Sequence, residues 1–194
     1  QGDMMVSPTK EALMREAELL LRTCGYSALS YADLAEKVKI QKPSIHHHFP
    51  TKEDLGLAIV DGYLADFART LAHIDQTEEG AVAKLRMFAQ FFTSAIESRR
   101  LPLCGALAAE LQSLPKSMQK STRHFFEMHC DWLYRIIREG VRNGELRAEL
   151  DPKETASLIL SALEGSSFIS WVLIDDASVN SVFEATLRNL IRQP

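Results

Sequence analysis

Apolar residues recur along this chain at the three- and four-residue spacing of amphipathic helices, and no run of useful length alternates with the two-residue period of a strand. The first apolar stripe follows Thr9, a candidate N-cap, and ends before Gly25, a candidate helix stop. This stripe consists of Leu13, Ala17, Leu20 and Leu21. The same spacing continues through most of the sequence, so we expect an all-α fold.

Two short helices are predicted after the first one. Ser30 precedes the segment YADLAEKV as a candidate N-cap, with Asp33 in the position of a capping-box acid. After a tight turn, a second short helix is expected from about Lys42 to His48. Pro43 lies in its first turn, where a missing N–H costs little.

A long helix is expected next, from Lys52 to about Ile74, with Thr51 as its N-cap and two acids near its positive end. Prolines and an Asn-Gly pair then divide the remaining apolar stripes. We expect five more helices, over about 78–98, 103–113, 116–142, 152–173 and 179–192. The chain should therefore contain about nine helices, with short ones first and long ones after.

The composition is that of an ordinary globular protein, because 46% of the 194 residues are hydrophobic and 25% are charged. Three cysteines without a CxxC pair indicate a reducing compartment. The longest nearly unbroken apolar stretch, 168–174, is too short to span a bilayer, and no secretion signal is visible. We expect a cytoplasmic protein that does not use a membrane as a partner.

Residues 37–52 (KVKIQKPSIHHHFPTK) contain four lysines, three histidines and no acid, although the chain carries a net charge of −4. A local positive segment on an acidic protein indicates a surface for an anionic partner. Successive helical residues point about 100° apart, so the three histidines cannot converge on one ion, and no metal site is expected. A short helix, a tight turn and a second short helix form the helix-turn-helix arrangement.

In a helix-turn-helix, the second helix presents polar side chains to base edges while neighbouring helix N-termini meet phosphates. Ile45 and Phe49 are the expected inward anchors of this helix. Ser30, Thr51 and Lys52 open the flanking helices and offer hydroxyl, ammonium and backbone donors. The candidate reading residues are Gln41, Lys42, Ser44, His46 and His47.

The run GYSALSYADLAEKVKIQKPSIHHHFPTKEDL resembles the N-terminal signature of the TetR family of repressors, continuously over about residues 10–60. The resemblance implies a three-helix DNA-binding domain over 1–50 and a helical effector-binding and dimerisation domain over 51–194. It implies a homodimeric regulator, expected to be a repressor, that binds a palindromic double-stranded DNA operator and is released by a small-molecule effector. The full predicted DNA-contact set is Ser30, Tyr31, Gln41, Lys42, Pro43, Ser44, His46, His47, Thr51 and Lys52.

Three positions depart from the usual family pattern. Lys39 stands at the turn where members usually have glycine, and a left-handed conformation there costs a non-glycine residue roughly 1–2 kcal/mol. His46 replaces a frequent tyrosine, and Pro43 replaces a frequent glycine. The last two bear directly on which side chains contact bases.

The last two predicted helices carry apolar stripes with small residues, which suit pairing with a second copy of the chain. The predicted dimer residues are Leu158, Ala162, Ser166, Ile169, Val182, Phe183, Leu187 and Leu190. The alternative is that these stripes belong to the core of a single chain. The middle helices combine aromatic and polar residues, which either line an effector pocket or form plain core. The candidate pocket residues are Phe91, Phe92, Cys104, Phe125, His129, Trp132, Phe168 and Trp171.

Cys104 is a candidate sensor thiol, because it lies at the start of a predicted helix with Arg99 and Arg100 close in sequence. A helix N-terminus and nearby guanidinium groups lower the pKa of a thiol and favour the reactive thiolate. The run LCGALAAEL also resembles a TetR branch associated with acrylate-like and other reactive carbonyl compounds. The alternative is an inert buried thiol. Cys24 and Cys130 are expected to be core thiols.

Enzyme motifs are missing from the sequence, which contains no HExxH, GxGxxG, GxSxG or P-loop. No cofactor is expected. The rival hypotheses are a thiol-based electrophile sensor of the same fold acting through Cys104 and, outside this class, a helical enzyme or small-molecule-binding protein that does not bind DNA.

Overall fold

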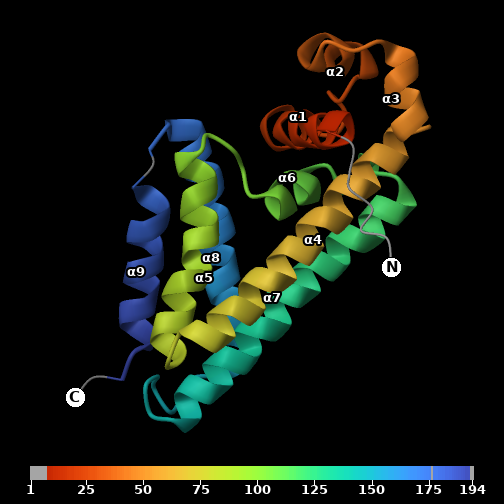
Figure 1. Cartoon of the computed structure of the whole chain (residues 1–194). Coiled ribbons are helices and arrows are strands. Elements are labelled where there is room, and N and C mark those ends of the chain that lie inside the picture. Colours follow the sequence, from red (N-terminus) through yellow and green to blue (C-terminus); the bar gives the residue numbers. More distant parts are fainter. Residues whose placement is uncertain (1–7, 176, 193–194) are drawn as a thin grey trace, which may run out of the picture.

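The computed structural model describes residues 8–175 and 177–192, and within these ranges the chain forms nine α-helices and one short 3-10 helix. The all-α fold expected from the sequence is confirmed. Three helices gather at one end of the molecule: α1 (Pro8–Cys24), α2 (Tyr31–Val38) and α3 (Lys42–His48) (Figure 1). These are the helices of the predicted helix-turn-helix.

Two long helices, α4 (Lys52–Thr77) and α7 (Lys116–Arg142), pack side by side and lead away from α1–α3 to the other end of the molecule (Figure 1). A second group of helices packs against their far ends. It comprises α5 (Ala81–Glu97), α8 (Pro152–Leu173) and α9 (Ser178–Leu190). Between the two groups lie α6 (Leu103–Ala109) and the 3-10 helix η1 (Leu111–Ser113).

The helix boundaries follow local capping chemistry. The Ser30 hydroxyl accepts a hydrogen bond from the Ala32 N–H at 3.2 Å and so caps α2 as expected. Thr51 and Asp54 form a complete capping box at the start of α4. Lys39 ends α2 in the left-handed conformation, with φ 58° and ψ 46°. The turn therefore has the backbone conformation that glycine adopts easily, although the residue is lysine.

Some predicted boundaries are wrong. The first helix begins at Pro8, so Thr9 lies inside it rather than capping it. The segment expected as one helix over 103–113 divides into α6 and η1, and α5 begins only after Gly80, whose φ is 83°. No full capping box forms at α2, since only its N-cap bond is made. By contrast, the bounds predicted for α7 and α8 are confirmed.

The buried side chains form two hydrophobic clusters that meet along α4. One cluster lies among the far half of α4, α5, α7, α8 and α9. The other joins α1–α3 to the first half of α4 and to α6, with Leu103 and Leu107 among its members. The core of the N-terminal helices therefore extends past the domain boundary predicted at residue 50, because it includes Leu55, Ile59 and Val60 of α4.

Two polar connections tie α1 and the turn after it to the segment around α6. Arg22 Nε donates to the Leu101 carbonyl at 2.7 Å, and the Leu101 N–H donates to the Arg22 carbonyl at 3.3 Å. On the other side of α6, the Glu110 carboxylate accepts from the Ser27 hydroxyl at 2.6 Å and from the Ser27 N–H at 3.1 Å. The N-terminal helices are thus anchored at both ends of α6.

One described helix, α8, is long and apolar enough in composition to cross a membrane. Core helices of soluble proteins pass the same test, and α8 packs against α5, α7 and α9. Its apolar character comes from two faces. One face is buried in the core, while the other exposes Leu158, Ile169, Val172 and Leu173.

Candidate nucleic-acid interface and effector region

The predicted reading surface is present on α3. Ile45 is fully buried and Phe49 nearly so, and these two anchors fix the helix against the N-terminal core. With its inner face held in this way, α3 presents its remaining polar residues outward. The exposed members of the predicted set are Gln41, Lys42, Pro43, Ser44, His46 and His47 on α3 or directly before it, and Thr51 at the start of α4.

Tyr31 fixes the junction between α3 and α4. Its hydroxyl lies 2.8 Å from the Phe49 carbonyl and 2.6 Å from the Thr51 carbonyl, and it donates to both. Burial, followed by the charge of Asp54, raises the pKa of Tyr31 to about 12, so this donor stays protonated. The ring also meets His46 edge-on, with centroids 4.8 Å apart. Tyr31 therefore sets the angle between α3 and α4 as well as lying in the predicted contact set.

Two hydroxyls predicted to contact phosphate are occupied by helix caps. The Ser30 hydroxyl caps α2, and the Thr51 hydroxyl donates to the Asp54 carboxylate at 2.7 Å while accepting from the Asp54 N–H at 3.1 Å. At position 51 the backbone N–H is also engaged, because it donates to the Asp54 carboxylate at 2.9 Å. A phosphate at either helix N-terminus would therefore have to meet first-turn N–H groups that the caps leave unused.

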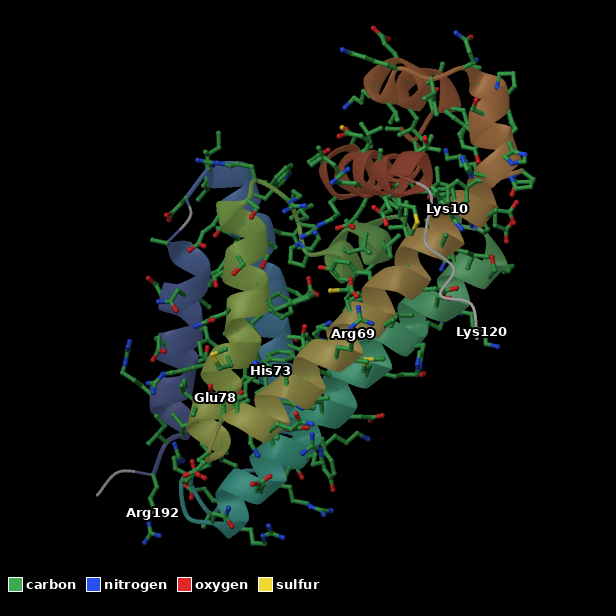
Figure 2. The ribbon with its side chains drawn as sticks, viewed as in Figure 1. Lys10, Arg69, His73, Glu78, Lys120 and Arg192 are labelled. Atoms are coloured by element: carbon green, nitrogen blue, oxygen red, sulfur yellow. The ribbon has the colours of Figure 1, made fainter. Side chains whose placement is uncertain are left out.

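Lys52 is half-buried, with Nζ 4.4 Å from the centroid of the Tyr26 ring. Burial lowers the pKa of Lys52, and the charge of Glu110 acts in the opposite direction. A phosphate contact by Lys52 would draw the ammonium away from Tyr26. Lys10, which the sequence analysis did not single out, lies near the start of α1 with Nζ 5.6 Å from the Phe49 ring (Figure 2).

The predicted dimer residues divide into two sets. Leu158, Ile169 and Val182 are exposed and Ala162 is half-buried, so these four are available to a second chain. The remaining four are buried within the single chain, and the prediction that they contact a partner is wrong for them. These are Ser166, Phe183, Leu187 and Leu190. Helical spacing identified both apolar stripes without showing which one a neighbouring helix covers.

The exposed apolar surface also includes residues outside the predicted dimer set. They continue the open face of α8 to its C-terminal end, where Val172 is 74% exposed and Leu173 is 68% exposed. Ile174, just beyond the helix, is 69% exposed and adopts the left-handed conformation that closes it. This concentration of large apolar side chains at one helix end is unusual for a surface that stays in water.

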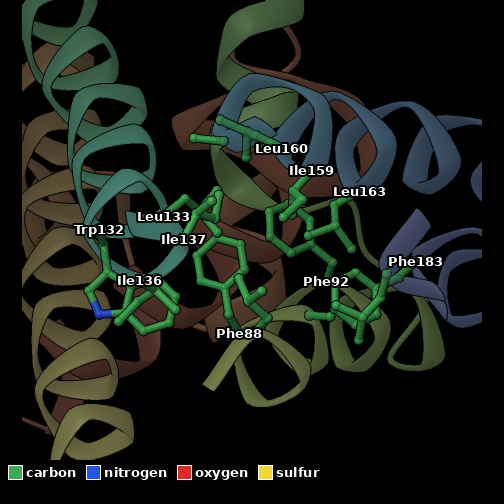
Figure 3. Close-up of a cluster of buried hydrophobic side chains, with 14 of the residues drawn as sticks. Phe88, Phe92, Trp132, Leu133, Ile136, Ile137, Ile159, Leu160, Leu163 and Phe183 are labelled. Carbon is green, nitrogen blue, oxygen red and sulfur yellow. The ribbon is translucent and has the colours of Figure 1, made fainter. Parts of the chain in front are cut away.

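Most of the predicted pocket residues are core. Phe92 is fully buried and Trp132 is nearly so (Figure 3). Phe125 and His129 are fully buried as well. His129 lies among phenylalanine rings with centroids 4.2–6.4 Å away, and neither of its ring nitrogens has a hydrogen-bond partner among the described residues. Burial lowers its pKa to about 3, so it is neutral near pH 7.

The other predicted pocket residues do not converge on a shared cavity. Phe91 lines a cleft between α4 and α5, Trp132 lines a hollow on α7, and Trp171 lines a third hollow near the end of α8. Phe168 is partly exposed and lies close to Gly105. The aromatic stripe mainly fills the interior, and one pocket formed by the whole set stays a prediction.

Cys104 is fully buried, and its Sγ donates to Glu164 Oε1 at 2.9 Å. Burial first, and then the charge of Glu164, raise the pKa of Cys104 well above its ordinary value. The expectation of a lowered thiol pKa is therefore wrong, and the alternative of a buried thiol describes the site. Cys24 is exposed, which corrects the expectation that it is a core thiol, and Cys130 is half-buried.

Glu164 is a largely buried acid that was not among the predicted site residues. Its Oε2 atom is buried and has no hydrogen-bond partner within residues 8–175 and 177–192. Burial raises the pKa of Glu164 to about 7, although the Cys104 thiol favours the charged form. The sequence did hold a signal, since Glu164 is the one acid in the apolar run LILSALEGSSFISWVL. A single acid among apolar residues on a helix is a candidate buried carboxylate.

Two family models match the chain. Residues 13–59 match the model described as "Bacterial regulatory proteins, tetR family", and residues 81–186 match "Tetracyclin repressor-like, C-terminal domain". The first match covers the helix-turn-helix and the start of α4, and the second covers α5 through most of α9.

Individual proteins resemble the chain over most of its length. The HTH-type transcriptional repressor DhaR of Mycobacterium sp. GP1 is 24% identical over 84% of this chain and 82% of its own. The transcriptional regulator AcuR of Cereibacter sphaeroides is 29% identical over 86% of this chain and 78% of its own. The crystal structure of a TetR-family transcriptional regulator from Agrobacterium tumefaciens superimposes with a TM-score of 0.90 at 25% identity, over 95% of this chain and 98% of that one.

Proposed function

The chain belongs to the TetR family of transcriptional regulators, and on this premise we propose that it acts as a homodimeric repressor released from a palindromic operator by a small-molecule effector. The family is one of DNA-binding regulators rather than enzymes. One structural observation supports DNA binding beyond what family membership implies. The acid-free face of α3 is exposed as a unit, while Ile45 and Phe49 hold the opposite face in the core.

The physical role proposed for α3 is readout of the DNA major groove. Gln41, Lys42 and Ser44 supply donors and acceptors at the exposed N-terminal part of the helix, the part that contacts base edges in this motif. His46 is held by the Pro50 carbonyl, 3.1 Å from its Nδ1, and by the edge of Tyr31. It therefore offers a fixed ring to the DNA backbone, in place of the family's frequent tyrosine.

Residues 1–50 are proposed as the DNA-binding domain and 51–194 as the effector-binding and dimerisation domain, in a cytoplasmic protein. Because α4 contributes to both hydrophobic clusters, a movement in the second unit would reach the first through this helix. Effector release then requires that the effector bind one arrangement of the two reading heads more tightly than the other.

Dimerisation is proposed through the open face of α8 and the adjoining residues of α9. Large apolar side chains are concentrated there, with Ile169 and Leu173 both more than half exposed. Two short reading helices on one dimer would contact two half-sites, which is how such small modules gain useful specificity. Sedimentation equilibrium measures this directly. Ile169→Lys should yield monomers, whereas Gln76→Lys, an exposed change on α4, should not, and a monomeric wild type would contradict the proposal.

A thiol-based sensor acting through Cys104 is not favoured by the site. A thiol with a raised pKa and no exposed surface presents little thiolate to an electrophile. A reversible effector is therefore the proposed signal. The Cys104→Ser variant distinguishes a reversible effector from an electrophile that reacts with Cys104, because the response to a reversible effector should stay intact in this variant.

The DNA-binding proposal is tested by anisotropy titration of the full-length protein with labelled DNA from upstream of its own gene. Lys42→Ala should weaken binding by about tenfold. If Lys42 contacts a phosphate, the slope of log affinity against log salt concentration should also fall by about one per protomer. Lys52→Ala should lower the salt dependence as well. Lys153→Ala is the matched control, because Lys153 is exposed at the start of α8. Wild-type affinity and salt slope in both Lys42→Ala and Lys52→Ala would refute the assignment.

A further inference from the structure

A cleft of about 390 Å³ lies between α4 and α5, on the outer side of the aromatic core. Its volume falls within the range of small-molecule sites, about 300–1,000 Å³. Residues from α1, α4, α5 and the segment after α5 line it, and none of them is an acid. These residues are Arg22, Tyr63, Thr70, His73, Ile74, Met87, Gln90, Phe91, Ser94, Ala95, Ser98 and Arg100.

One end of the cleft is positively charged. Arg22 is buried, and its Nε donates to the carbonyl of Leu101, the residue that follows Arg100, so both guanidinium groups belong to the same end. Arg22 has an ion pair with Glu18, at 2.9 Å. Arg100 is half-buried, and its side chain has no ion pair with any residue that the structure describes. An anion in the cleft would therefore meet one guanidinium that no protein carboxylate neutralises.

The rest of the cleft is apolar with a polar margin. Tyr63 and Phe91 meet edge to face, with centroids 5.7 Å apart, and Met87 and Ile74 continue this wall away from the arginines. His73, on α4 where it approaches α5, lies on the lining as well (Figure 2). The two ends thus differ in character, because one carries guanidinium groups and the other is largely apolar.

We propose that this cleft binds a small amphipathic anion, with its carboxylate at Arg22 and Arg100 and its hydrocarbon chain along Phe91, Tyr63 and Met87. Guanidinium groups bind carboxylates with paired, charge-assisted hydrogen bonds, and a half-buried position strengthens that attraction relative to open water. At about 30 Å³ for each non-hydrogen atom, the cleft holds roughly ten to thirteen such atoms. A straight-chain carboxylate of eight to ten carbons has about this size.

The position of the cleft suggests how occupancy would reach the DNA-binding end. Arg22 is in the last turn of α1, and its reciprocal bonds to Leu101 join that helix to the segment leading into α6. A carboxylate at Arg22 competes with Glu18 for the same guanidinium and contacts α1, α4 and α5 at once. This inference rests on the proposed function only in taking the ligand to be the effector, and binding itself can be measured without DNA.

Isothermal titration of the full-length protein tests the ligand class. Octanoate should bind saturably, with one site per protomer, while octyltrimethylammonium and 1-octanol, which carry the same chain with a positive charge or none, should bind at least about tenfold more weakly. Arg100→Gln should weaken octanoate binding about tenfold without changing the melting temperature. Arg123→Gln, an exposed change on α7, should leave binding unchanged. No saturable octanoate binding, equal binding of the cation, or equal binding by Arg100→Gln would overturn the proposal.

The same probe separates this proposal from the regulator proposal. If octanoate binds as expected but no upstream DNA is bound at any salt concentration, the cleft stands and the repressor proposal fails. If the protein binds DNA and octanoate does not bind, the cleft proposal fails alone. Release of bound DNA by octanoate, lost in Arg100→Gln, would support both.

Discussion

Glu164→Gln should change how the stability of the protein depends on pH. In the native state the carboxyl of Glu164 is buried, with one oxygen unpartnered, and its pKa is raised to about 7 from an unfolded value of 4.5. Between these values the native state holds more protons than the unfolded state. The contribution of Glu164 to stability is therefore present below about pH 4.5 and is lost as pH rises to about 7.

The size of this effect follows from the shift of the pKa. A shift of about 2.5 units at ~1.36 kcal/mol each sets an upper limit of roughly 3.4 kcal/mol. We expect about 2 kcal/mol, because the side chain keeps some solvent contact. Glutamine is neutral at every pH and can still accept from the Cys104 thiol, so the variant mimics the protonated acid. It should gain stability relative to wild type as pH rises.

Urea unfolding followed by circular dichroism, at about pH 5, 6, 7 and 8 and one protomer concentration, measures the difference. His129 has the opposite dependence, because its native pKa of about 3 removes stability as pH falls below 6.5. That contribution is present in both proteins and cancels on subtraction. Parallel stability curves for wild type and Glu164→Gln would refute the assignment of a buried, protonated carboxyl.

Further variants test the core and the junctions. His129→Phe should move acid unfolding to lower pH, since no buried imidazole is left to protonate, and an unchanged acid transition would contradict this. Tyr31→Phe loses two hydrogen bonds to carbonyls and should lower the free energy of unfolding by about 1–2 kcal/mol in urea titration. In native-state labelling with a thiol reagent, followed by mass spectrometry, Cys24 should react rapidly, whereas Cys104 should react only at the rate at which the protein opens. Equal labelling rates would show that the Cys104 thiol is not buried. Gly25→Ala should cost about 1–2 kcal/mol in thermal melts, because φ is 88° and the new Cβ would overlap the Glu110 carboxylate.

Helix positions were predictable because their causes are local. The bounds of α7 and α8 follow from prolines at their starts and an Asn-Gly pair after α7, all visible in the sequence. The same holds for the N-cap at Thr51, although its completion into a capping box by Asp54 was not predicted. Exposure of α3 was also predictable, because its two anchors and its polar residues alternate at helical spacing.

Contacts between distant segments were not predictable in the same way. The N-terminal position of Cys104 in a helix was visible, but its burial was not, nor was the contact with Glu164, 60 residues away. Burial first, and then the charge of Glu164, reverse the expected shift of the thiol pKa. Phe183 and Leu158 both occupy apolar stripes, and only packing shows that the first is buried and the second is open. The arginine end of the α4–α5 cleft joins residues 22 and 100, which no local pattern connects.

The continuity of α4 sets a rule for recombining this protein with its relatives. The helix supplies Leu55 and Ile59 to the core beneath the reading head and Phe67 and Leu71 to the core of the other unit. A chimera cut at residue 50 would join a foreign head to a helix shaped for the native one, and would also lose the fit to Leu103 and Leu107 of α6. Exchanges of operator specificity should therefore be made by grafting the exposed face of α3, leaving the helix beneath it whole.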